Sequence, residues 1–177
     1  MENLKPPFGL EFGMDRHSVI EIMKKQRESY YYESKSDYNN LLFHDIKLAG
    51  RECKVTLRLI DGKLCRVEIS ITQYGHFTKD IELYNQIKSE INAKYYITEN
   101  DFIEYHPPAY FDDNFEETHE QNIKRRLIEY TAFWNFSSNG DYDDYIFIKI
   151  TNEFTIKIIY EHGDLNRKFI EKQKSEW

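Results

Sequence analysis

Cysteine is scarce in this chain of 177 residues, which contains only Cys53 and Cys65. Neither belongs to a Cys-x-x-Cys pair, and no histidine pair stands at zinc-finger spacing, so the sequence predicts no structural zinc site. Both cysteines occupy inward positions of an expected hairpin, several residues apart along it. Their Cα atoms should be farther apart than the ~7 Å that a disulfide allows. We therefore expect two free, buried thiols, as in a reducing compartment.

Long apolar runs are also missing. No stretch approaches the ~20 residues that cross a bilayer, so we expect no transmembrane segment. Residues 1–7 lack the basic and apolar regions of a secretion signal. With this start taken as native, the expected location is the cytoplasm.

Clustered positive charge is lacking as well. The formal net charge is −7, and the 24 lysines and arginines are scattered among 31 carboxylates. Phosphate backbones and anionic membranes favour clustered lysine and arginine, so neither nucleic acid nor an anionic membrane surface is expected as a partner. A basic protein surface would suit this charge.

Catalytic and ligand-binding motifs are equally scarce. The stretch Pro7–Met23 carries Gly9 and Gly13 ahead of a helix, without the close glycines and lysine of a phosphate loop. Segment 139–144 lacks the acidic start and the closing glutamate of a calcium loop. There is no Gly-x-Ser-x-Gly elbow, and the carboxylates stand in runs typical of solvated surface. The sequence therefore predicts a protein that is not an enzyme and holds no cofactor or metal.

Amphipathic patterns predict three helices. The first covers about Arg16–Gln26 and begins after Asp15, whose carboxylate can accept N–H groups of the first turn. The second covers about Lys79–Tyr95 and has the clearest apolar stripe in the chain. A weaker pattern predicts a C-terminal helix over 164–176.

Alternating apolar residues predict two groups of three strands. In the first strand, the residues expected to face the core are Leu42, His44, Ile46 and Leu48. One-sided burial forbids a register slip, so we expect the turn at Asp61-Gly62 to be a three-residue loop with a bulge. The other inward runs are Cys53–Leu59, Cys65–Ile71, Ile128–Phe136, Ile146–Ile150 and Phe154–Tyr160.

This order of elements predicts a single α+β domain over 1–177. We expect two tandem αβββ units, residues 8–72 and 79–160, which form about six antiparallel strands with the helices packed on one face. Neither unit alone would cover its sheet well, so the two should share a core.

The second unit would carry an acidic insertion over 97–123. This segment has eight carboxylates, several aromatic residues, and no lysine or arginine. His106 and His119 lie in it without the spacing of a metal site, which predicts a solvated acidic loop. A connection this long is uncommon in a compact domain and tends to be functional.

Two motifs resemble a known class of small α+β domains. They are FGLEFGMDRHSVIEIM (8–23) and VTLRLIDGKLCRVEISI (55–71). They are similar to the helix entry and the strand–turn–strand of the β-lactamase-inhibitor-protein-like fold, which also includes a small lipoprotein of the outer-membrane barrel-assembly machinery. The resemblance covers 8–72 by motif and 79–160 by element order. It implies tandem repeats whose sheet grips a protein partner without catalysis. The chain departs from that class in lacking a secretion signal and a disulfide-compatible cysteine pair.

The leading functional hypothesis is a non-enzymatic protein-binding domain, inhibitor- or immunity-like, for a basic partner. Exposed aromatic residues flanked by carboxylates suit recognition of such a surface. The expected contact residues lie in the acidic insertion: Tyr105, His106, Tyr110, Phe111, Asp112 and Asp113.

Two alternatives stay open. One is a small-molecule-binding or enzymatic domain with a pocket between sheet and helices, lined by His44, Tyr84 and Tyr130. The other is a structural or oligomer-forming module, since the sequence leaves the oligomeric state undetermined.

Overall fold

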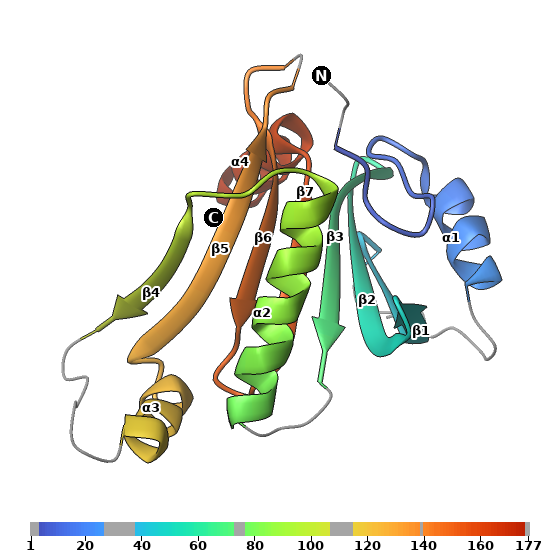
Figure 1. Cartoon of the computed structure of the whole chain (residues 1–177). Coiled ribbons are helices and arrows are strands. Elements are labelled where there is room, and N and C mark those ends of the chain that lie inside the picture. The colour runs from blue at the N-terminus through green and yellow to red at the C-terminus, as the bar shows by residue number, and fades with distance from the viewer. Residues whose placement is uncertain (1–3, 27–37, 73–76, 107–114, 139, 176–177) are drawn as a thin grey trace. The chain divides into compact units, whose positions relative to one another are not determined.

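The protein is an α+β fold, seen in a computed structural model that describes residues 4–26, 38–72, 77–106, 115–138 and 140–175 (Figure 1). Its strands form one antiparallel sheet in the order β1-β2-β3-β7-β6-β5-β4. The elements are α1 (Arg16–Lys25), β1 (Asn40–Leu48), β2 (Arg51–Ile60), β3 (Lys63–Ile71), α2 (Phe77–Lys94), β4 (Asp101–Tyr105), α3 (Phe115–Lys124), β5 (Ile128–Phe136), β6 (Asp144–Ile150), β7 (Ile156–Glu161) and α4 (Gly163–Ser175).

The fold class is confirmed, but the sheet has seven strands, not about six. The additional strand is β4, which lies with α3 inside the segment 97–123 that the sequence predicted to be a loop. Every residue of β4 is exposed, so no inside–outside alternation marks it as a strand. None of the helices in the described parts of the chain is long and apolar enough to cross a bilayer.

Two compact units divide the chain. Unit 1 consists of Met1–Ile69, Asn135–Ile146 and Ile159–Trp177, and unit 2 of Ser70–Trp134 and Phe147–Ile158. Each unit combines stretches from distant parts of the sequence. The division into tandem repeats at 8–72 and 79–160 stays a prediction.

Helix α1 of unit 1 begins as its capping residue predicts. Asp15 has extended backbone angles (φ −73°, ψ 160°), and its side chain accepts the N–H of Ser18 at 3.0 Å. The helix buries Val19, Ile20 and Met23. The carboxylate therefore satisfies one of the N–H groups that a helix start leaves without a partner.

The first half of strand β1 faces the core with the opposite phase to the prediction, whereas Ile46 is buried as predicted. Leu41 and Phe43 are buried, whereas Leu42 and His44 are only half-buried. The register with β2 shifts between Phe43 and Ile46. A bulge adds one residue and reverses the alternation, so Ile46 is again buried. The prediction that His44 faces the core was wrong because sequence alternation does not reveal a bulge.

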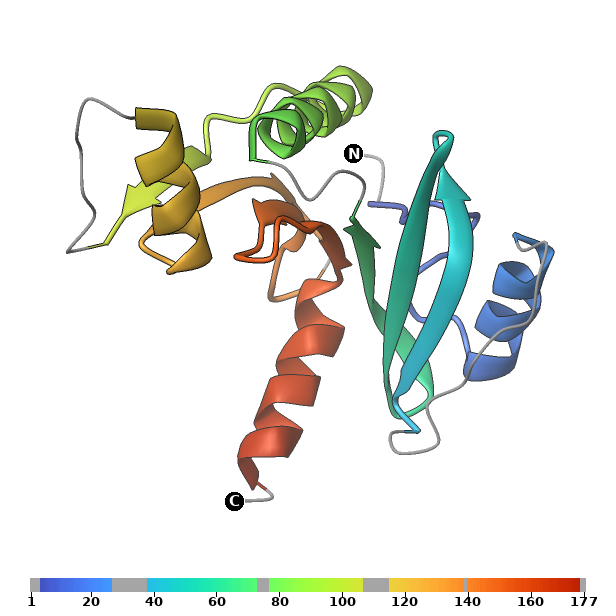
Figure 2. The ribbon, with the colours of Figure 1, turned by 90° about the horizontal axis from the view of Figure 1, so that it is seen from below.

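The β2–β3 hairpin also differs from the prediction. Its loop is a two-residue turn in which Asp61 and Gly62 both have positive φ, 50° and 74°, as in a type I′ turn. A longer loop was expected because one face of these strands was taken to be solvated. Instead, the Arg58 guanidinium lies 4.6 Å above the ring of Phe169 in α4. Figure 2 shows α1 and α4 on opposite sides of β1–β3, so the helices of unit 1 do not share one face.

The two cysteines are free and buried, as predicted. The Cys53 thiol lies 3.3 Å from the carbonyl oxygen of Ile46, and the Cys65 thiol lies 3.4 Å from that of Arg58. Burial raises the pKa of Cys53 to about 11 and that of Cys65 to about 12. Both side chains therefore act as small apolar groups of the core.

Helix α2 organises unit 2 with the apolar stripe that the sequence predicts. Leu83, Tyr84, Ile87 and Ile91 are buried in its middle turns. The end of the helix is attached to β5 by Trp134, which is fully buried. Its indole N–H lies 2.9 Å from the Asn92 Oδ1 atom and 3.1 Å from the Tyr96 carbonyl oxygen. This attachment holds β5 against α2 and so positions β4, the neighbour of β5.

Candidate functional site

Strand β4 lies at one end of the strand order, so β5 is its one strand neighbour among the described residues. The antiparallel pairing runs from Asp101↔Ala132 to Tyr105↔Ile128. Backbone hydrogen bonds extend it at both ends, from the Phe133 N–H to the Asn100 carbonyl (2.9 Å) and from the His106 N–H to the Leu127 carbonyl (2.8 Å). β4 is thus a regular edge strand with one edge bonded to β5.

Large apolar side chains are exposed along this edge. Phe102 is 42% exposed, Ile103 46% and Tyr105 44%. Single exposed apolar residues are normal on protein surfaces, but three within five residues of an edge strand are not. Exposed apolar groups gathered in this way mark sites of protein–protein contact.

Negative charge accompanies these apolar groups. Glu104 lies directly opposite Glu129 in the β4–β5 pairing, and the Nε2 atom of His106 is 3.9 Å from the carboxylate of Glu104. Like charges on opposed positions repel one another, so a positive group from a partner would relieve this repulsion. We refer to Asp101–His106 together with Glu129 as the β4 surface.

The same residues form the one potential metal-ligand group among the described parts of the chain. The ligand atoms of Glu104, His106 and Glu129 lie within 4.8 Å of one another, and all three side chains are exposed. Among the described residues, no buried side chain is hydrogen-bonded to them, whereas metal ligands are typically oriented by further hydrogen bonds. We therefore interpret the group as negative surface charge.

Two of the predicted contact residues, Tyr105 and His106, belong to the β4 surface. The other four (Tyr110, Phe111, Asp112 and Asp113) lie outside the described residues. Phe102, Ile103 and Glu129 of this surface were not among the predicted contact residues. The signal for the first two was the run DFIEY, which has strand-forming residues in an otherwise acidic segment.

Aromatic side chains support β4 and β5 from α2 and α3. His119 of α3 is buried, and its Nε2 atom is 2.8 Å from the Tyr130 hydroxyl. Tyr105 meets the His119 ring edge-to-face at 6.1 Å, and Tyr84 meets Tyr130 in the same way at 6.1 Å. Burial lowers the pKa of His119 and raises that of Tyr130 to about 12. Tyr105 is thus held in place on one side while it is exposed on the other.

These contacts also place the residues of the predicted pocket. Tyr84 and Tyr130 meet each other in unit 2, whereas His44 belongs to unit 1. The Tyr84 hydroxyl is buried without a hydrogen-bond partner among the described residues. The two tyrosine rings pack against each other.

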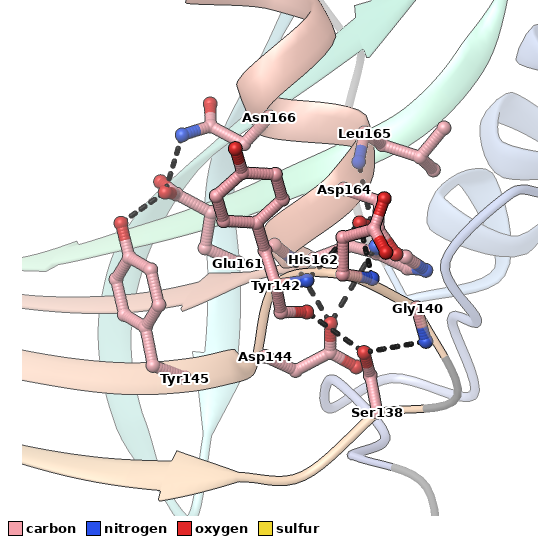
Figure 3. Close-up of polar contacts among 12 residues, drawn as sticks. Ser138, Gly140, Tyr142, Asp144, Tyr145, Glu161, His162, Asp164, Leu165 and Asn166 are labelled. Atoms are coloured by element: carbon pink, nitrogen blue, oxygen red, sulfur yellow. Dashed lines mark hydrogen bonds and ion pairs between the residues drawn. The ribbon is translucent and has the colours of Figure 1, made fainter.

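A separate polar hollow of about 450 Å³ lies in unit 1 at the start of α4 (Figure 3). We call it the α4 hollow. Asp144 is 7% exposed, and its Oδ1 atom accepts the N–H of Gly163 at 2.9 Å. The same oxygen is 3.5 Å from the Nδ1 atom of His162. Burial raises the pKa of Asp144. Lining residues are Leu4, Lys5, Glu11, Phe12, Ser138, Gly140, Asp144, His162 and Asp164.

The other polar groups of the α4 hollow hold the backbone that connects β5 to β6. Asp164 accepts the N–H groups of Asp141 and Tyr142 at 3.1 and 3.2 Å. The Ser138 hydroxyl donates to the Tyr142 carbonyl at 2.7 Å and accepts the N–H of Gly140 at 3.1 Å. The Ser138 bonds are local and shape a tight loop, and the Asp164 bonds attach that loop to the start of α4. The polar groups of the α4 hollow therefore have a structural role: they stabilise the start of α4 and close this loop.

A buried ion pair also attaches α4 to the sheet. Glu161 is 1% exposed and accepts hydrogen bonds from Arg66 Nη1 (3.2 Å), from the Tyr145 hydroxyl and from the Asn166 side-chain amide. Arg66 also contacts Glu68 at 3.1 Å. Burial raises the pKa of Tyr145, which keeps it protonated as a donor. The cluster joins β3, β6, β7 and α4.

Comparison with known proteins adds no relative: no protein-family model, curated protein or solved structure matches the chain. The resemblance to the β-lactamase-inhibitor-protein-like fold and the cytoplasmic location therefore stay predictions. The function has to be argued from the site itself.

Proposed function

We propose that the protein is a non-enzymatic protein-binding domain that recognises a basic partner through the β4 surface. One observation carries this proposal: Phe102, Ile103 and Tyr105 are exposed on an edge strand within a segment, 97–123, that contains no lysine or arginine. The resemblance in the first half of the chain supports an inhibitor- or immunity-like role.

Apolar and charged groups would contribute differently to such binding. Burial of exposed aromatic and aliphatic side chains supplies most of the affinity in protein interfaces, because a few central residues dominate the binding energy. The carboxylates of Glu104 and Glu129 would select a partner of positive charge and accelerate its approach. Tyr110, Phe111, Asp112 and Asp113 follow β4 in the sequence and stay predicted members of the same surface.

The alternative of a ligand pocket lined by His44, Tyr84 and Tyr130 has less support. Tyr84 and Tyr130 pack against each other, and none of the three lines the α4 hollow. The structural or oligomer-forming alternative can be tested by light scattering on the purified protein.

The proposal can be tested by capture from the native host. We expect the immobilised wild-type protein to retain a basic protein that the variant Ile103→Ser with Glu104→Lys no longer retains. The matched control is Ile170→Ser in α4, because Ile170 is also exposed (36%) and lies outside the β4 surface. The proposal is wrong if the β4 variant and the control variant retain the same proteins in equal amounts.

A further inference from the structure

We infer that the partner binds by adding an extended, basic strand to the outer edge of β4. This inference rests on the proposed protein-binding function and specifies how the β4 surface would be used. Addition of a strand to an exposed sheet edge is a general mode of peptide recognition, in which backbone hydrogen bonds supply affinity and side chains supply specificity.

The backbone of β4 has the alternation that strand addition requires. In an antiparallel ladder, every second residue directs its N–H and C=O groups toward the same neighbour. The bonds at Asn100 and His106 show that the even-numbered residues of this segment face β5. Asp101 and Ile103 therefore direct their N–H and C=O groups toward the outer edge. No strand in the described parts of the chain pairs with that edge.

The side chains predict the pattern of the incoming strand. Ile103 and Tyr105 point to the face of the sheet that carries their β5 partners, Tyr130 and Ile128 respectively. Phe102 and Glu104 point to the other face, where Glu129 lies opposite Glu104. Opposed residues of paired strands contact one another. A fitting strand would therefore place apolar residues beside Ile103 and Tyr105, and lysine or arginine beside Glu104.

Charge argues against a second copy of this chain as the added strand. Antiparallel pairing of two β4 edges around a twofold axis would bring Glu104 and Glu129 of both copies to one face of the joined sheet. Like charges on one face of paired strands are destabilising. A basic segment brings the opposite charge to the same position.

The test uses a synthetic peptide as the probe. A capped ten-residue peptide of alternating lysine and valine is titrated into the isotope-labelled full-length protein, and a peptide of alternating glutamate and valine is the control. NMR shifts give the affinities, and hydrogen exchange reports the Ile103 amide. We expect binding of the lysine peptide alone, with slower exchange of the Ile103 N–H in the complex. Absence of binding, or equal binding of both peptides, overturns the inference.

Two substitutions at one position separate backbone pairing from side-chain contact. Ile103→Pro removes an N–H that does not bond to β5, and proline is tolerated on edge strands. Ile103→Ala keeps the N–H and shortens the side chain. Loss of one backbone hydrogen bond predicts about tenfold weaker binding for Ile103→Pro than for Ile103→Ala. Equal affinities overturn strand addition. Trp134 fluorescence, from the neighbouring strand β5, checks that both variants fold.

A charge reversal keeps the inference testable if Ile103→Pro does not fold. The double variant Glu104→Lys with Glu129→Lys should have the reversed peptide preference: it should bind the glutamate peptide and not the lysine peptide. An unchanged preference overturns the inference. If light scattering instead shows a wild-type dimer and a monomeric Ile103→Pro variant, a second copy occupies the edge and the basic-strand inference is wrong.

Failure of strand addition can be distinguished from failure of the proposed function. If a captured host protein is lost by Ile103→Ser with Glu104→Lys but retained by Ile103→Pro, the β4 surface binds a partner without an added strand. If none of these variants changes capture, the proposed function fails as well.

Discussion

Glu161 offers the sharpest test of how α4 is held to the sheet. Its carboxylate is 1% exposed and accepts hydrogen bonds from three side chains, of which Arg66 is charged. Removing one partner of a fully buried ion pair costs ~3–5 kcal/mol. Because the Arg66 side chain is 22% exposed and keeps its contact with Glu68, we expect a smaller cost, about 2 kcal/mol for Glu161→Gln. The glutamine oxygen can still accept from Tyr145 and Asn166.

Glu161→Ala should cost more than Glu161→Gln. It removes the acceptor of the Tyr145 hydroxyl, the Asn166 amide and the Arg66 Nη1 group, which predicts a loss of about 4 kcal/mol. Urea unfolding followed by far-ultraviolet circular dichroism gives both free energies, and calorimetry should show Tm falling by roughly 2–4 °C per kcal/mol for a chain of this size. A Glu161→Gln protein within about 0.5 kcal/mol of wild type, the range of an ordinary surface substitution, would refute the argument.

Three further predictions concern single positions. Gly163→Ala would place a Cβ atom 2.4 Å from the carbonyl oxygen of Asp143, so urea unfolding should show a loss of about 1–3 kcal/mol; an unchanged stability would contradict the close approach. Asp15 caps α1, and hydrogen bonds in the first turn lower its pKa. Its stabilising effect is therefore present above the ordinary value of 3.8 and lost as the pH falls through the lowered value. The Tm values of wild type and Asp15→Ala should differ at pH 7 and converge in acid. A Tm difference that does not change with pH would show that the charge of Asp15 does not contribute. Because burial raises the pKa values of Cys53 and Cys65, iodoacetamide should label neither in the folded protein and both in urea, with mass spectrometry as the measurement; rapid labelling of the native protein would contradict their burial.

Local patterns were sufficient to predict three of the four helices; α3 lies in the segment predicted to be a loop. Asp15 before a polar–apolar stripe predicted the start of α1, and the stripe from Ile81 to Tyr95 predicted α2. Both signals depend on residues within a few positions of one another, where capping and the helical period act. The same holds for β6, whose burial alternates without interruption.

Strand phase and turn length were predicted wrongly where distant elements decide them. The bulge between Phe43 and Ile46 reverses the burial of β1, and it depends on the pairing with β2. The short turn at Asp61-Gly62 is compatible with the fold because α4, more than 100 residues later, covers Arg58. Sequence alternation, read as one buried and one solvated face, does not reveal that a distant helix packs on the second face.

The candidate site was predicted in part. Acidity and aromatic content drew attention to 97–123, and Tyr105 and His106 lie on the β4 surface. His119 lies in the same segment, but it is buried against Tyr130. Composition does not report which residues of this segment are exposed on β4 and which, like His119 of α3, pack against β5.

The sequence by itself determined the α+β class, the start of α1, the free thiols and the negative charge of the segment around β4. Each follows from residue chemistry or from short-range periodicity. Only the tertiary structure decided that DFIEY forms an edge strand, that Glu104 meets Glu129, and that Ile103 directs its backbone groups outward. These features depend on pairing between strands separated by a helix, and such pairing is governed by packing across the whole sheet.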